Sequence, residues 1–225
     1  MFTGLDLYGR VVAEIEAQAD SPGVVVPAHL FGALVNSALR GVNNKTPIYF
    51  RRRKGSTKSG KRYRIWPDSI RRIIRASING ESLTIERRYQ FAGVGDAEVH
   101  DSTHGGVVAC WIETDTQHHL KLVGFDNLPG SDQVVRYILN EDPPKFTDAA
   151  EPMPCEPEAE EALFHHVMVS LSRTENFHLR NYYNDYLAML LEDIEALKPL
   201  VDRVVYSQGR VDDNFIAEDD RGMHY

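Results

Sequence analysis

Long hydrophobic runs are absent from this chain of 225 residues, and their absence excludes a class of protein. No stretch of eighteen apolar residues occurs, so the sequence predicts no transmembrane helix. The first twenty residues are acidic and mixed, whereas a secretory signal places an apolar run after a basic start. We therefore expect a cytoplasmic protein without a membrane partner.

Cysteine is scarce, which argues against a disulfide framework. The only two cysteines lie in unlike contexts: Cys110 in an apolar, strand-like run and Cys155 in an acidic stretch rich in proline. A reduced chain is the simplest interpretation. Cys110 is then expected to be a small core residue and not a nucleophile.

Sequence signatures of cofactor binding are also missing. The glycines at 4, 9, 93, 95, 105 and 106 form neither a P-loop nor a dinucleotide fingerprint, so no cofactor is expected. Residues 55–60 resemble a phosphate loop only in composition, and we interpret them as a turn. The apolar fraction of 42% and the charged fraction of 26% are those of an ordinary globular chain.

Charge, by contrast, is abundant and unevenly distributed. Residues 45–75 hold twelve Lys and Arg and one acid, Asp68, so this segment carries +11 within a chain of net charge −8. Residues 141–225 hold nineteen acids and seven bases, a net of −12. The two blocks could serve different partners or attract each other.

The pattern of apolar residues predicts an α+β fold. Helices are expected over residues 5–18 and 27–41, the second ending at Gly41. Aromatic, strand-like runs at 47–53 and 62–66 flank a polar loop and predict a basic β-hairpin arm. A helix is expected from Pro67 to 78, because Ile70, Ile73, Ile74 and Ile78 share one helical face.

Antiparallel strands and more helices are expected beyond the arm. Strands are predicted over 82–91, 107–113 and 118–125, and a helix over 131–139. Residues 141–161 contain five of the eleven prolines and eight acids, which predicts a mobile linker. The predicted organisation is therefore an α+β domain at 1–140, a linker at 141–161 and a helical region with an acidic tail at 162–225.

The basic arm favours nucleic-acid binding. Arginines and lysines on a hairpin can hold phosphates, aromatic rings can stack on bases, and the following helix would extend the track. The candidate contact residues are Arg51, Arg52, Arg53, Lys54, Lys58, Lys61, Arg62, Tyr63, Arg64, Trp66, Arg71, Arg72 and Arg75. The hypothesis is a non-enzymatic, DNA- or RNA-binding subunit or accessory factor of a nucleoprotein assembly. Its acidic C-terminal helices would keep the protein soluble, mediate assembly, or compete for the arm when no nucleic acid is bound.

Two alternatives remain open at this stage. In the first, the protein is an adaptor or inhibitor whose arm grips an acidic protein surface. Close tyrosines at 182, 183 and 186 also suggest that the C-terminal helices dock on other protein subunits.

The second alternative is a metal-dependent nuclease. His100, His104 and one of His118 or His119 would then bind the metal, with Glu98 or Asp101 as a base. Their spacing matches no strong metal signature, so no metal is the primary expectation.

Overall fold

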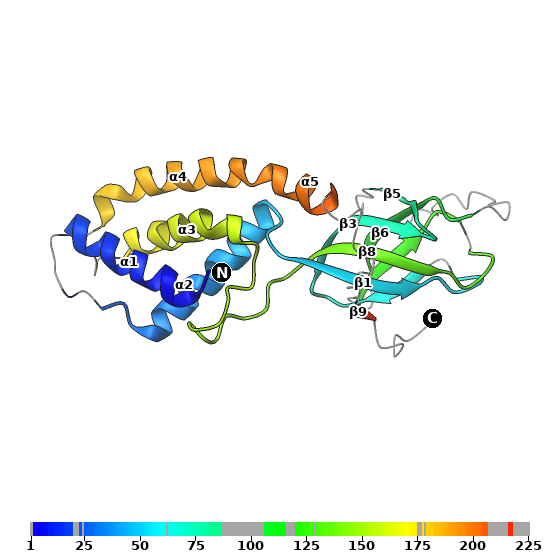
Figure 1. Cartoon of the computed structure of the whole chain (residues 1–225), viewed down its shortest axis with the longest axis horizontal. Helices are drawn as coiled ribbons and strands as arrows, with labels where there is room; N and C mark the ends of the chain where they lie inside the picture. Colours follow the sequence, from blue (N-terminus) through cyan, green and yellow to red (C-terminus); the bar gives the residue numbers. More distant parts are fainter. Residues whose placement is uncertain are drawn as a thin grey trace. The chain divides into compact units, whose positions relative to one another are not determined.

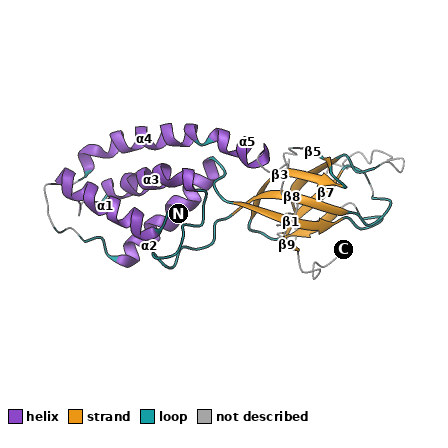
Figure 2. Cartoon of the chain, in the orientation of Figure 1, coloured by secondary structure: helices purple, strands orange, loops and turns teal. Residues whose placement is uncertain are grey.

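The α+β class is confirmed by the structure, a computed structural model. It describes residues 2–19, 23, 25–61, 63–86, 106–115, 120–127, 129–174, 177, 179–206 and 216–217. The chain forms two compact units (Figure 1). Met1–Tyr49 and Asp142–Val204 make the helical unit, and Phe50–Glu141 with Val205–Tyr225 make the β unit. Figure 2 shows helices in one unit and strands in the other.

This division differs from the order predicted along the sequence. Phe50, at the start of one strand, pairs with Asn140, near the end of another, so the chain enters and leaves the β unit on neighbouring strands. Asp142 onward then returns to the helices that begin the chain. Pairing between strands that are distant in the sequence therefore explains why the units do not follow the predicted boundaries at 140 and 162.

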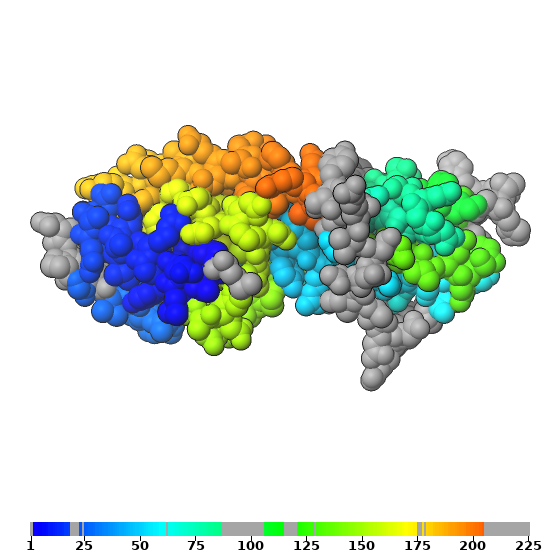
Figure 3. Space-filling model, viewed as in Figure 1, coloured from blue at the N-terminus to red at the C-terminus, as the bar shows by residue number. Residues whose placement is uncertain are grey.

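The helical unit is built from amphipathic helices. Their bounds are α1 Gly4–Ala19, α2 Ala28–Lys45, α3 Glu160–Ser172, α4 Tyr183–Ala196 and α5 Lys198–Tyr206, with short 3-10 helices η1 Pro157–Ala159 and η3 Arg180–Tyr182. In α1, Leu7, Val11 and Ile15 recur every four residues and are fully buried. Figure 3 shows α1, in blue, packed against α3, in yellow-green. No helix in the described ranges is long and apolar enough to cross a membrane.

Two details of the helical unit correct the predictions. Helix α2 continues past Gly41 to Lys45. A Cβ added at Gly41 would come within 2.4 Å of the His166 ring, so this glycine permits close approach of α2 and α3 and does not end the helix. The long helical region expected after residue 162 is divided into α3, α4 and α5.

The predicted mobile linker is instead attached to the helical unit. Phe146 donates its N–H to Asn36 Oδ1 over 2.9 Å, and its ring meets Phe31 edge-on. Met153, which is buried, donates its N–H to the Phe2 carbonyl over 2.9 Å. Proline and acid content suggested mobility, but a few well-placed apolar side chains and backbone hydrogen bonds order the segment.

Two sheets make up the β unit. The first has the order β4-β3-β8-β1-β9, with β4 Glu81–Ser82, β3 Ile70–Ile78, β8 Val134–Glu141, β1 Phe50–Ser56 and β9 Ile216–Ala217. The second has the order β2-β7-β6-β5, with β2 Tyr63–Trp66, β7 Leu120–Phe125, β6 Ala109–Asp115 and β5 Thr84–Ile85. Inward side chains of both sheets share one core, which includes Trp66, Cys110, Phe125 and Tyr137. The expectation that Cys110 is a core residue is confirmed.

The antiparallel pair predicted at 107–113 and 118–125 is confirmed as β6 and β7. Two predicted helices are strands: residues 70–78 form β3 and residues 134–141 form β8. Register shifts between Ile70 and Arg72, and between Ile73 and Arg75, separate the inward residues of β3 by three positions. That spacing resembles a helical face and explains the wrong prediction.

The predicted basic hairpin is not formed. Strand β1 pairs with β8, whereas β2 pairs with β7 in the other sheet. The basic residues are therefore distributed over two sheets of a folded unit instead of lying on one projecting arm.

Candidate nucleic-acid interface

The outer face of the β3-β8-β1 sheet collects basic side chains from three strands. Successive side chains of a strand point to opposite faces, and Val135, Tyr137 and Leu139 of β8 point into the core. The alternate positions therefore face away from it. We use the term basic face for the outer residues Arg52, Lys54, Arg72, Arg75 and Arg136.

The strand register places these five cations close together. Lys54 lies opposite Arg136, and the next outer row joins Arg52, Ile138 and Arg75. A third row places Arg72 beside Asn140. With strands about 4.8 Å apart and about 6.6 Å between same-face neighbours, the five Cα atoms span roughly 10 Å by 13 Å.

Burial varies across this face. Arg72 is exposed, and the other four cations are half-buried. Ile138 and Asn140, which lie between them on β8, are buried. The solvent-accessible parts of the five cations therefore lie around the buried side chains of Ile138 and Asn140.

Arg51 and Arg53 stand on the opposite side of β1 from the basic face. Arg51 lies opposite Leu139 and Arg53 opposite Tyr137, both core residues. Arg53 donates through Nε to Glu141 Oε1 over 2.5 Å and through a terminal nitrogen to Oε2 over 3.1 Å. Its charge is therefore balanced within the unit.

Arg64 and Trp66 are removed from the candidate interface because both are buried. Arg64 is 8% exposed and donates to the Ser56 carbonyl over 3.1 Å, which links β2 to β1. Trp66 is 3% exposed and meets the Tyr137 ring edge-on at 4.6 Å. An indole in that position cannot stack on a base, and its contribution is to the core.

The loop residues lie apart from the basic face in the strand order. Lys58 pairs with Asp132 at 3.2 Å, and Lys61 is exposed. Tyr63 of β2 is 40% exposed and meets Trp111 edge-on at 6.4 Å. Arg71 is exposed at the irregularity that starts β3, and Arg62 lies outside the described residues.

Arg136 belongs to the basic face but was missed by the sequence analysis. It lies far along the chain from the 45–75 segment and within a span interpreted as a helix. The alternation of Val135, Tyr137 and Leu139 around it was the signal that could have identified an outward strand position.

The metal-site residues, His100, His104, His118, His119, Glu98 and Asp101, all lie outside the described residues. Within the described ranges, no group of three or more His, Cys, Asp or Glu side chains is placed to hold a metal.

The tyrosines proposed as docking anchors have partners inside the helical unit. Tyr186 is buried and donates its hydroxyl to Glu14 Oε1 over 2.8 Å, and burial raises its pKa above the ordinary tyrosine value. Tyr183 accepts a hydrogen bond from Arg173. Both hydroxyls are thus engaged within this unit.

Formal charge separates with the units. The helical unit contains 17 acids and 8 bases, a net of −9, whereas residues 50–141 contain 11 acids and 15 bases, a net of +4. Residues 205–225 add five acids and two bases, so the whole β unit carries +1 and its positive charge is concentrated in residues 50–141. No family model matches the sequence, and a search of curated proteins found no match.

Proposed function

We propose that the protein binds nucleic acid through the basic face and serves as a non-enzymatic subunit or accessory factor of a nucleoprotein assembly. The observation that carries this proposal is the convergence of Arg52, Lys54, Arg72, Arg75 and Arg136 on one side of three neighbouring strands of the five-stranded sheet. None of the register-paired outer positions on β1, β8 and β3 is acidic.

Phosphate contacts explain how such a face would work. Each cation that meets a phosphate releases condensed counterions, which makes binding favourable at low salt. Five contacts predict a log–log slope of affinity against salt of about −4.5 for duplex and about −3.5 for a single strand. Most of these contacts read no sequence, so the face supports attachment rather than base recognition.

The test is fluorescence anisotropy with single-stranded and duplex DNA and RNA over a salt series. The basic-face variant carries Arg52→Gln, Arg72→Gln, Arg75→Gln and Arg136→Gln. A control with the same loss of charge carries Arg40→Gln, Lys61→Gln, Lys145→Gln and Lys198→Gln, all at exposed positions off that face. Binding that is lost in the first variant and kept in the control supports the proposal.

Equal losses in both variants would show that net charge, and not the basic face, attracts the ligand. Absence of wild-type binding to all four nucleic acids at low salt would overturn the proposal. The same variants would then be tested for loss of an acidic protein partner, which is the adaptor alternative.

A further inference from the structure

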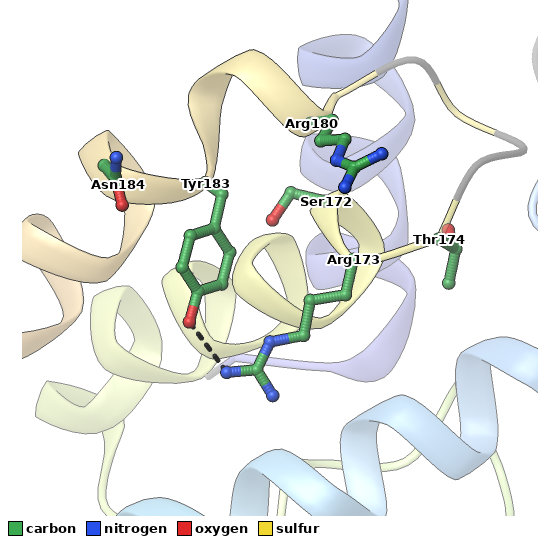
Figure 4. A pocket seen from close by; sticks show the side chains of 6 residues that line it. All are labelled: Ser172, Arg173, Thr174, Arg180, Tyr183 and Asn184. Atoms are coloured by element: carbon green, nitrogen blue, oxygen red, sulfur yellow. Dashed lines mark hydrogen bonds between the residues drawn. The ribbon is translucent and has the colours of Figure 1, made fainter.

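A polar pocket lies in the helical unit, where α3 ends and α4 begins. Its volume is about 400 Å³. Figure 4 shows the six lining residues that the structure describes, which are Ser172, Arg173, Thr174, Arg180, Tyr183 and Asn184. All six residues belong to the helical unit, so this pocket is separate from the basic face in the β unit.

The end of α3 determines which groups in the pocket can donate hydrogen bonds. Ser172 donates its hydroxyl to the Val169 carbonyl over 2.9 Å, and Thr174 donates to the Leu171 carbonyl over 2.7 Å. These hydroxyl protons satisfy carbonyls of the last helical turn. The strong donors left to face a ligand are the two arginines, with Asn184 and the Tyr183 hydroxyl beside them.

Arg173 is held in position by Tyr183. A terminal guanidinium nitrogen donates to the Tyr183 hydroxyl over 2.7 Å, the contact drawn in Figure 4. The guanidinium carbon also lies 5.2 Å from the centre of the same ring. A guanidinium carries five N–H donors, so this contact leaves most of them for another acceptor.

Arg180 reaches the pocket from a different element. It begins η3 and is exposed, and the buried residues Phe177 and Leu179 before it anchor the segment. Two guanidinium groups, one after α3 and one in η3, therefore line a single cavity. Because the two groups come from separate elements, a ligand held by both would connect the end of α3 to the start of α4.

The charge of this pocket contrasts with that of its unit. None of the six described lining residues is acidic, so these six carry +2 in a unit of net charge −9. Two other arginines of the unit pair with carboxylates: Arg10 bonds Glu160 and Glu161, and Arg203 bonds Glu158. Arg173 instead bonds a neutral phenol, which leaves its charge uncompensated by that contact.

We propose that this pocket binds the phosphate group of a small molecule, with the exposed Arg180 turning toward Arg173 so that both side chains hold its oxygens. A phosphate monoester carries nearly two negative charges at neutral pH, which two guanidinium groups balance, whereas a carboxylate carries only one. The planar fork of arginine also suits two phosphate oxygens at once. A volume of about 400 Å³ lies in the range of small-molecule sites, so the group can be part of a compact ester.

The experiment is isothermal titration calorimetry of the full chain with inorganic phosphate, AMP and acetate at constant ionic strength. Phosphate and AMP distinguish the free anion from an ester. The double variant Arg173→Met with Arg180→Met should bind both at least about tenfold more weakly, because two charged hydrogen-bonding groups are lost. The matched control, Arg40→Met with Lys145→Met, should bind within about twofold of wild type, since neither residue lines the pocket.

Two further variants guard against an effect on folding. Arg180→Met alone changes an exposed side chain and should still weaken binding several-fold with an unchanged circular dichroism spectrum. Tyr183→Phe keeps the ring, removes the hydroxyl that positions Arg173, and should also weaken binding. The proposal is overturned if wild type shows no saturable binding of phosphate or AMP, if the double variant binds as wild type does, or if acetate binds as tightly as phosphate.

Because the pocket and the basic face lie in different units, the proposal does not rest on nucleic-acid binding. Loss of phosphate binding in the double variant with unchanged nucleic-acid binding would support it and leave the proposed function untouched.

Discussion

Arg53 and Glu141 form a two-point ion pair inside the β unit, with Nε 2.5 Å from one carboxylate oxygen and a terminal nitrogen 3.1 Å from the other. The side chains are 16% and 4% exposed. This pair joins β1 to the last residue of β8, near the positions where the main strands of the unit begin and end.

Breaking this pair from one side should destabilise the β unit. Glu141→Ala leaves the Arg53 charge largely buried without its carboxylate, and we expect a loss of about 3 kcal/mol in the free energy of unfolding. Urea denaturation of wild type and variant would measure this difference in the free energy of unfolding. The double change Arg53→Met with Glu141→Met should cost clearly less, because no charge remains buried. An equal or larger loss in the double variant would contradict this interpretation.

Gly124 should tolerate no side chain. A Cβ built there would lie 2.5 Å from Cε2 of Trp111, whose side chain is only 1% exposed. Gly124→Ala should therefore lower the free energy of unfolding by about 1–3 kcal/mol through overpacking. Gly130→Ala is the matched control, since nothing lies within 4 Å of its added Cβ, and it should change stability by less than about 0.5 kcal/mol. Similar effects at both positions would show that Trp111 is not the constraint.

The two thiols should make the fold sensitive to alkaline pH. Burial raises the pKa of Cys110 and of Cys155 to about 12, above the value of an unfolded cysteine. As pH rises, the thiols of the unfolded chain lose their protons before those of the folded protein do. The free energy of unfolding therefore keeps its full value below about pH 9 and falls as pH rises toward 12. Cys110→Ala should flatten part of this decline, measured by urea denaturation at pH 8 and pH 10.5. A decline that is the same in that variant would exclude Cys110 as a cause.

Arg136 should contribute to nucleic-acid binding although it lies outside the basic segment of the sequence. Arg136→Gln removes one cation from the basic face, so the salt slope should become shallower by about 1 and affinity should fall similarly for all sequences. Lys58→Gln removes a cation that lies off the basic face and should have a smaller effect. Anisotropy over a salt series measures both, and an unchanged slope in Arg136→Gln would remove this residue from the proposed interface.

The C-terminal segment should compete with nucleic acid. Strand β9 pairs in parallel with β1 at Arg53 and Lys54, and residues 205–225 contain five acids and two bases. A chain ending at Tyr206 lacks β9 and all five carboxylates, so it should bind nucleic acid more tightly. Deletion from residue 141 would be a poor test, because it also removes α3, α4 and α5.

A second variant of that segment separates charge from strand pairing. Changing its five acids to Asn or Gln retains Ile216 and Ala217 while removing the negative charge. Tighter binding in this variant and in the truncated chain would assign the competition to charge. Unchanged or weaker binding in the truncated chain would show that the segment does not compete.

Local periodicity was sufficient to predict α1, α2 and the β6–β7 pair. Leu7, Val11 and Ile15 repeat at the helical spacing without interruption, and the strands of the pair are adjacent in sequence. The class of β3 could not be predicted in this way, because its irregular register gives Ile70 and Ile73 a helical spacing. A pattern read along one strand carries no information about bulges imposed by its neighbour.

For the candidate site, the sequence failed mainly to predict which strands pair. A Gly- and Ser-rich loop between β1 and β2 is typical of a hairpin, yet each strand pairs with one from much later in the chain. Counting charges identified Arg52, Lys54, Arg72 and Arg75, but the count could neither separate them from the buried Arg64 nor add Arg136. Those distinctions depend on register and burial, which arise only when distant segments meet.

The pairing of Phe50 with Asn140 has a consequence for the modularity of this chain. Since the two ends of the 50–141 segment are adjacent, removing it would leave a gap that a short turn between Tyr49 and Asp142 could bridge. The strands can therefore be regarded as a cassette carried by a helical host.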